Sequence, residues 1–186
     1  MTIKSDQEET VKPDQESILK ALIRKYLKED CFIESEPNVD NYEFQFRVKF
    51  PILQDKEGNQ IGRNVGISKP DKKNYLEINN RIVLPEDALK LVKELDISKK
   101  QILTNELKFY LLSQNLLSTI DFDNNFFVFL DKLYFNDSDY PNINELYHSI
   151  MKIINSQIAV MNILSGYLGV INKDNIDLET KDSYFQ

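Results

Sequence analysis

Apolar and polar residues alternate most regularly in the stretch YEFQFRVKFP, from Tyr42 to Pro51. Successive side chains of a strand point to opposite faces of a sheet, so this pattern predicts a β-strand with an aromatic core face and an outward polar face. An alternative is that part of the aromatic face, or an open sheet edge, receives an extended partner segment by strand addition. The predicted core face consists of Tyr42, Phe44, Phe46, Val48 and Phe50.

Shorter runs of the same kind predict the other strands. Three of them are CFIES, NVGISKP and NYLEINNRIVLP, and the later stretch STIDFDNNFFVFLDKLYF predicts a hairpin with its turn at residues 123–125. Asn79 and Asn80 predict a bend within the fourth run. The short connections between the first four runs favour antiparallel pairing, because parallel neighbours need a longer crossover.

Apolar residues spaced three and four positions apart predict four helices. They cover residues 14 to 28, 85 to 96, 98 to 115, and 142 to Gly166 or Gly169. SKKQ, residues 98–101, has the form of a capping box, and Asn142 is followed three positions later by Glu145. The last helix has apolar residues around much of its circumference, so we expect it to be buried on more than one side.

This order of elements predicts the fold class and the domain organisation. We expect an α+β fold with an antiparallel or mixed sheet of about five strands and helices packed on one face. A length of 186 residues with 41% hydrophobic residues suits one core. We therefore expect a single domain over residues 14–171, a disordered acidic tail over 1–13 and a polar tail over 172–186.

Charge and composition narrow the class of partner. The net charge of −7 disfavours binding to nucleic acid and to anionic lipid. The most apolar run, residues 158–171, is shorter than the roughly 20 residues of a membrane span, so we expect none. The single cysteine, Cys31, excludes an internal disulfide, and the polar N-terminal stretch does not look like a signal peptide. A cytoplasmic location is the simplest interpretation.

No motif in the chain points to a reaction. The sequence lacks a glycine-rich phosphate loop, and a single histidine, His148, excludes a pair of histidine metal ligands. We therefore predict no catalytic residue, no metal site and no cofactor. A nucleophilic pair of Cys31 and His148 is an alternative, but a buried inert thiol is the commoner case.

Two pairs of aspartates are further alternatives. Asp137 and Asp139 in NDSDYPN are spaced as in a calcium loop, yet the glycine and the distal glutamate are missing, so a turn or capping role is expected. Asp121 and Asp123 could form an acid/base pair in principle. Aspartates on the solvent-facing side of an edge hairpin are more often solvated charges than an acid/base pair.

The chain also resembles a known family. YEFQFRVKFP, VGISKP with NYLEINNRIVLP, and VFLDKLYFNDSDYPNINELYHSIMKIINSQIAVMNIL resemble the class I type III secretion chaperone fold. They resemble more closely a mainly archaeal family of unknown function given the same chaperone-like fold. The resemblance spans residues 16 to 168. The family's tyrosine, any residue, aspartate, glycine sequence is only partly met, because Asp137 comes one residue late and Ser138 replaces the glycine.

The resemblance implies a function. Class I chaperones are small acidic homodimers without catalytic residues that hold an extended partner segment. We therefore expect a non-enzymatic protein-binding module, chaperone-like or adaptor-like, that acts as a homodimer on a protein partner. The alternative is an enzyme or small-ligand binder with a carboxylate and tyrosine site that shows no motif. A cleft with converging acids would favour that alternative, and a shallow apolar groove would favour the module.

Self-association is expected because the last helix carries more apolar surface than one sheet face covers. Either this helix or the paired helices of residues 85–115 would supply the interface. The predicted interface residues on the last helix are Ile154, Ile158, Met161, Leu164 and Leu168.

Overall fold

The structure is a computed structural model that describes residues 15–51, 56–58, 62–136 and 139–169. The tails expected over residues 1–13 and 172–186 lie outside the described residues. The elements, in chain order, are α1 (Gln15–Asp30), β1 (Phe32–Ser35), β2 (Tyr42–Phe50), β3 (Arg63–Pro70), β4 (Tyr75–Ile82), α2 (Glu86–Glu94), α3 (Ile97–Ser113), β5 (Leu117–Asp121), β6 (Phe126–Tyr134) and α4 (Ile143–Leu168).

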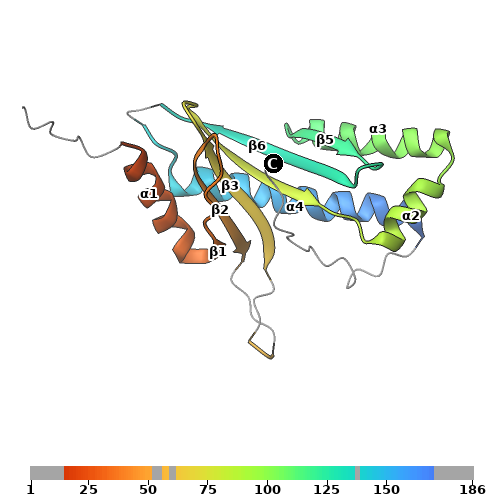
Figure 1. Cartoon of the computed structure of the whole chain (residues 1–186), viewed down its shortest axis with the longest axis horizontal. Coiled ribbons are helices and arrows are strands. Elements are labelled where there is room, and N and C mark those ends of the chain that lie inside the picture. Colours follow the sequence, from red (N-terminus) through yellow and green to blue (C-terminus); the bar gives the residue numbers. More distant parts are fainter. Residues whose placement is uncertain (1–14, 52–55, 59–61, 137–138, 170–186) are drawn as a thin grey trace, which may run out of the picture.

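The strands form one antiparallel sheet in the order β1-β2-β3-β4-β6-β5 (Figure 1). Four helices pack against it, which confirms the α+β class, and the sheet has six strands where about five were predicted. The chain returns from α3 through the β5–β6 hairpin, and β6 pairs with β4. This pairing joins the N-terminal and C-terminal strands into a single sheet.

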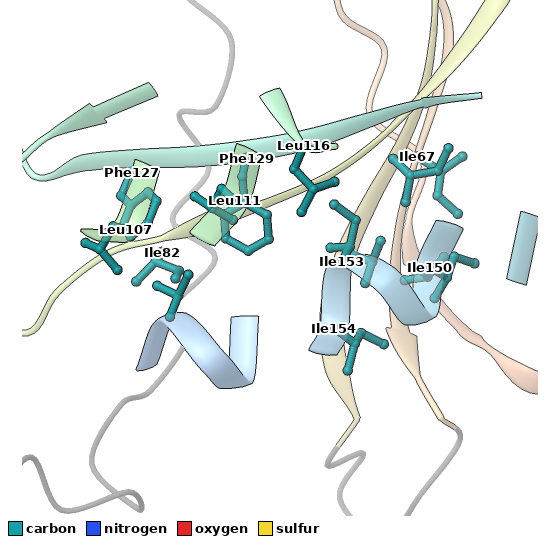
Figure 2. Close-up of a cluster of buried hydrophobic side chains, with 14 of the residues drawn as sticks. Ile67, Ile82, Leu107, Leu111, Leu116, Phe127, Phe129, Ile150, Ile153 and Ile154 are labelled. Carbon is teal, nitrogen blue, oxygen red and sulfur yellow. The ribbon is translucent and has the colours of Figure 1, made fainter. Parts of the chain in front are cut away.

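The core lies between one face of the sheet and the helices. α4 contacts β3, β4 and β6, while α1 packs at the β1–β2 end and α3 at the β5 end. Figure 2 shows α3, α4 and strand side chains meeting in one buried cluster. It includes Ile67, Ile82, Leu107, Leu111, Phe127, Phe129, Ile150 and Ile153.

The aromatic face of β2 is divided between the core and the opposite face of the sheet. Phe44, Phe46 and Val48 are buried, and Phe50 is half-buried with its ring centre 5.9 Å from that of Tyr147. Tyr42 differs from the expectation. The β2–β3 register shifts between Tyr42 and Phe44, and this irregularity turns the Tyr42 side chain to the face that carries no helix.

The first residues of α3 and α4 are set by the side chains that cap these helices. Asn142 and Glu145 form the full capping box of α4. α3 begins at Ile97 instead of at the SKKQ motif, because Asp96 accepts a hydrogen bond from the Lys99 backbone N–H at 2.8 Å. Aspartate caps a helix as well as serine does, so the earlier residue starts the helix.

The bend expected at residues 79–80 does not form. β4 continues through both asparagines to Ile82. Asn80 lies on the core side of the sheet, and its Nδ2 donates a hydrogen bond to the Asn64 carbonyl at 2.6 Å. This bond satisfies part of a buried polar side chain inside the sheet, and the strand stays regular.

Candidate ligand-binding site on the open sheet face

One face of the sheet carries no helix among the described elements, and we call it the open face. Its side chains occupy the positions that alternate with the core residues of β2, β3, β4 and β6. These positions are Gln45, Arg47, Lys49, Asn64, Gly66, Ser68, Glu77, Asn79, Arg81, Val128, Leu130 and Lys132.

The sheet bends sharply at its centre. β3 and β4 pair only from Gly66–Asn79 to Ser68–Glu77, whereas β2–β3 and β4–β6 pair along most of their lengths. Figure 1 shows β2 and β3 crossing the direction of β4 and β6. The open face is therefore concave and forms a cavity of about 200 Å³, which we call the hollow. Residues of β1, β2, β3, β4 and β6 line it.

A glycine lies at the centre of the hollow. Gly66 is opposite Arg47 on one side and Asn79 on the other. A Cβ at Gly66 would lie 2.5 Å from the Asn79 Oδ1 atom, well inside van der Waals contact. The missing side chain therefore lets Asn79 lie over the strand and keeps the floor of the hollow open.

Two of the buried polar side chains that line the hollow, Gln45 and Ser68, carry an atom without a hydrogen-bond partner among the described residues. Gln45 and Ser68 face each other across β2 and β3, and they are only 5% and 2% exposed. Within the described part of the chain, neither Gln45 Nε2 nor Ser68 Oγ has a hydrogen-bond partner. Buried polar groups are nearly always paired in folded proteins, so these two need an explanation. A ligand that pairs with them supplies one.

Charged groups surround these polar atoms. Arg47 and Arg81 both line the hollow, and the guanidinium carbon of Arg81 lies 5.1 Å from the ring centre of Phe126. Stacking on an aromatic ring orients a guanidinium. The register sets Arg47 two residues from Gln45 on β2 and Glu77 directly opposite Ser68, so charges of both signs lie near the two polar side chains.

The two carboxylates of the hollow have partners of their own. Glu34 lies 3.5 Å from the ammonium group of Lys49, and Glu77 Oε2 accepts a hydrogen bond from the Tyr42 hydroxyl at 3.4 Å. Burial raises the pKa of Tyr42, and the charge of Glu77 raises it further. The hydroxyl therefore stays protonated at neutral pH and acts as a donor.

The remaining wall is apolar. Phe126, Val128 and Leu130 follow one another at every second position of β6 and line the hollow beside β4. Apolar walls with a few fixed polar groups are typical of ligand sites. Over the described residues, no group of three or more histidine, cysteine, aspartate or glutamate side chains could hold a metal ion.

His148 and Cys31 lie outside the hollow. His148 is exposed on α4, and Cys31 is buried after α1. Burial raises the pKa of the Cys31 thiol to about 12, with a smaller contribution from Asp30, so the thiol is protonated at neutral pH. Among the described contacts, no hydrogen bond links Cys31 to His148.

A shallower depression lies beside His148 on the helix side. Asp131 accepts a hydrogen bond from the Ser149 hydroxyl at 2.6 Å and pairs with Lys152 at 2.9 Å. Both carboxylate oxygens are engaged in these contacts. The two contacts attach α4 to β6, so the role of Asp131 is structural.

Of the two aspartate pairs considered from the sequence, the structure describes both members of only one. Asp121 forms a turn by accepting bonds from the backbone N–H groups of Asp123 and Asn124, and Asp123 lies 3.3 Å from the ammonium group of Lys100. The Asn124 side-chain amide, which donates to Asp121 Oδ2 at 2.7 Å, lowers the pKa of Asp121 most, and the backbone bonds lower it further, so Asp121 stays ionised. Asp139 is exposed, and Asp137 lies outside the described residues.

The residues expected at a dimer interface are mostly in the core. Ile154, Leu164 and Leu168 are buried within the chain itself, so they are not available for a surface contact in the folded protein. Met161 is half-buried, and Ile158 is exposed. This burial has a physical reason: α4 is covered by the sheet on one side and by α2 and α3 near its end.

Sequence reasoning missed the hollow because it assigned the polar positions of β2 to solvent. The composition of the strands does carry one signal of such a site. Gln45, Asn64, Ser68 and Asn79 are uncharged polar residues in strands, and Gly66 stands in the middle of a strand. Solvated strand faces more often carry charged residues, and a strand glycine often marks a close backbone approach.

Comparison with known proteins places the chain in a family. Residues 19–164 match the family described as "Uncharacterized conserved protein (DUF2299)", and the chain belongs to this family. No curated protein matches it. A solved structure of an uncharacterized protein from Methanothermobacter thermautotrophicus is similar, with a TM-score of 0.68 and 19% identity over 81% of this chain and 99% of that chain.

These comparisons show membership of an uncharacterized family and a similar fold in an archaeal protein; they do not show the fold of the class I type III secretion chaperones, and they carry no function. At 19% identity the likeness shows the architecture alone. Over the described residues, none of the helices has the length and apolar character needed to cross a membrane.

Proposed function

We propose that this protein is a non-enzymatic binding module that holds an extended segment of a partner protein in the hollow of the open face. The observation that carries the proposal is the pair of buried, unpartnered polar groups, Gln45 Nε2 and Ser68 Oγ, in a concave surface with an apolar wall. A bound segment would pair with these groups through its main-chain or side-chain atoms.

The shape of the hollow supports an extended ligand. Its lining runs across the sheet from Glu34 of β1 to Leu130 of β6, and it opens on the sheet surface. Polar groups line one side and apolar groups the other, which suits a segment whose successive side chains point in opposite directions. The resemblance to class I type III secretion chaperones adds support, because those proteins hold extended partner segments.

A second candidate function is binding of a small ligand. The Tyr42–Glu77 hydrogen bond at the edge of a cavity of about 200 Å³ favours it, because a fixed donor and acceptor could orient a compact molecule. The concave, open form of the site favours the protein segment over this alternative.

Self-association is the second part of the proposal, and α3 offers the surface. Its solvent side exposes Ile102, Phe109 and Leu112, and Phe109 is 72% exposed. These residues belong to the paired helices that the sequence offered as an alternative to α4. We also infer a reducing, cytoplasmic location from the single buried thiol of Cys31.

Light scattering tests the self-association. The double variant Phe109→Glu, Leu112→Glu should be monomeric near 21.8 kDa, and Lys108→Glu on the same helix should keep the wild-type mass. A wild-type protein that is monomeric at micromolar concentration would contradict this part of the proposal.

Co-purification from the protein's own cells tests the binding site. The Gly66→Val variant fills the floor of the hollow, whereas Gly166→Ala is a matched control because nothing lies within 4 Å of a Cβ at that position. We expect the partner to be lost from Gly66→Val and kept by Gly166→Ala. Val128→Trp, which fills the hollow from β6, is the second variant in case Gly66→Val does not fold. A partner kept by every folded hollow variant would refute the proposal.

A further inference from the structure

The two edges of the sheet are built differently. A strand at a sheet edge presents unpaired main-chain groups, so soluble proteins protect their edges with short strands, bulges or charges. β1 has all three protections: it has four residues, its register with β2 shifts between Ile33 and Ser35, and Glu34 forms an ion pair with Lys49. β5, at the other edge, has none of them.

β5 is a regular strand with little charge. Its sequence is LSTID, and it pairs with β6 over its whole length without a register shift. Its one charged residue, Asp121, is engaged by the backbone N–H groups of the adjoining turn. Within the described part of the chain, no strand lies beyond β5. This edge is therefore open to another strand.

Apolar side chains are exposed on both sides of β5. Figure 1 shows α3 and β5 together at one border of the molecule, and α3 turns Ile102, Phe109 and Leu112 to solvent there. On the open face, Leu117 is 56% exposed and lies opposite Leu130 in the register with β6. Soluble monomers rarely leave such a contiguous apolar surface uncovered.

A second copy of this chain suits this border. Residues 102–120 contain one acidic and one basic residue, Glu106 and Lys108, although the net charge of the whole chain is −7. Two copies can therefore approach here without the repulsion that other surfaces of an acidic chain produce. The exposed side chains present on the order of several hundred Å² of apolar surface, as the apolar part of an interface of about 800 Å² per partner requires.

The sequence of β5 is compatible with pairing to itself. An antiparallel strand pair about a two-fold axis makes each contact twice, once in each direction. With Thr119 on the axis, Leu117 lies opposite Asp121 of the second copy, and Ser118 lies opposite Ile120 of the second copy. This register places no like charges opposite each other.

The hollow reaches the same edge of the sheet. Its apolar wall consists of Phe126, Val128 and Leu130 of β6, and the register sets Thr119 opposite Val128 and Leu117 opposite Leu130. Leu117 thus continues the wall onto β5, where it ends in solvent. Pairing of two β5 edges would join the apolar walls of two hollows into one surface.

We propose that two copies pair through antiparallel β5 strands around Thr119, with their α3 helices packed together on the helix side of the joined sheet. The two open faces then form one surface, and a single partner segment contacts both hollows. The second copy completes the binding site, because the apolar wall of each hollow ends at the β5 edge. The statement about the segment rests on the proposed function, because it extends the same hollow.

Cross-linking tests the strand pairing. Cβ atoms of directly opposite residues in antiparallel strands are about 4.5 to 5.5 Å apart, so Thr119→Cys should be joined to a second copy by a short bis-maleimide reagent. Ser35→Cys on the β1 edge is the control and should stay unlinked. The native Cys31 is buried, so it does not compete in the folded protein. A folded Thr119→Cys variant that gives no linked dimer would overturn the strand pairing.

Light scattering separates the contribution of β5 from that of α3. The wild type should have about twice the mass of one chain, and the double variant Leu117→Lys, Thr119→Lys should be near 21.8 kDa. Both side chains are exposed, so this variant should keep the circular dichroism of the wild type. Leu117→Met, Thr119→Val is the uncharged control and should keep the wild-type mass. A folded lysine variant with the wild-type mass would overturn the proposed interface.

Calorimetric titration tests the joined site. The probe is a peptide selected with the full chain from a phage-displayed library of random 20-residue sequences. We expect one peptide per two chains of the wild type, and affinity at least about tenfold weaker for the lysine variant, because the second hollow no longer adds to binding.

The outcomes distinguish this inference from the proposed function. One peptide per chain, with equal affinity for the wild type and the monomeric lysine variant, would overturn the joined site and leave segment binding intact. Selected peptides that all bind Gly66→Val as tightly as the wild type would instead refute the proposed function, while the cross-linking and light-scattering results would still decide the pairing of β5.

Discussion

The unpartnered amide of Gln45 leads to an expectation about stability. Gln45→Leu keeps a similar side-chain volume and removes a buried donor that has no partner among the described residues. A buried unsatisfied group costs about 1 to 3 kcal/mol, so its removal should stabilise the free protein. Because leucine packs differently from glutamine, we expect the low end of this range, a gain of about 1 kcal/mol in the free energy of unfolding.

Urea denaturation followed by circular dichroism measures the change. Asn80→Leu is the matched control, because Asn80 is equally buried but donates a hydrogen bond to the Asn64 carbonyl. We expect the control to destabilise the protein by about 1 to 3 kcal/mol, since it leaves that carbonyl without its donor. Equal slopes of the two transitions would show that the unfolded states are comparable.

The two variants should also separate stability from binding. Gln45→Leu should bind the partner segment less tightly than the wild type although it is more stable, which is the signature of a group retained for function. A loss of 1 kcal/mol or more in Gln45→Leu would show that the amide is paired in the folded protein. That result would remove the main support for the hollow as a ligand site.

Three further expectations concern the fold. Lys69 and Glu43 form a buried ion pair at 2.7 Å, so Lys69→Met should lower the free energy of unfolding by about 3 to 5 kcal/mol in urea denaturation. The double variant Lys69→Met, Glu43→Leu should recover most of that stability, because it leaves no buried charge unpaired. Near-neutral effects of both single variants, Lys69→Met and Glu43→Leu, would contradict this expectation. Phe129→Ala should cost about 3 to 5 kcal/mol in the same assay, because the ring is fully buried. The Cys31 thiol should resist a thiol reagent until the protein unfolds. Because folding raises its pKa from 9.0 to about 12, the thiol of the unfolded chain ionises at lower pH than that of the folded chain. The free energy of unfolding should therefore fall as the pH rises through that interval. Rapid labelling of the folded protein would refute the last expectation.

The regular parts of the fold could be predicted from periodicity. The alternation in β2 and the apolar stripes of the helices report which side chains are buried, and burial follows the period of each element. The α4 capping box was visible for the same reason, because its two residues are three positions apart and act locally.

Features that depend on long-range geometry could not be predicted. The shift that turns Tyr42 to the open face is set by pairing with β3, and the bend of the sheet is set by the short β3–β4 pairing. The burial of Gln45 and Ser68 follows from that bend. A pattern of alternating residues cannot distinguish a polar face in water from a polar face that lines a concave surface.

Amide hydrogen exchange of the full chain, alone and with the partner segment, tests the central claim most directly. The account predicts that the ligand slows exchange in β2, β3 and β4 around Gln45, Gly66 and Asn79, and leaves the solvent side of α3 unchanged. Protection confined to α3 or to the helix side of the sheet, with none around Gly66, would contradict the account.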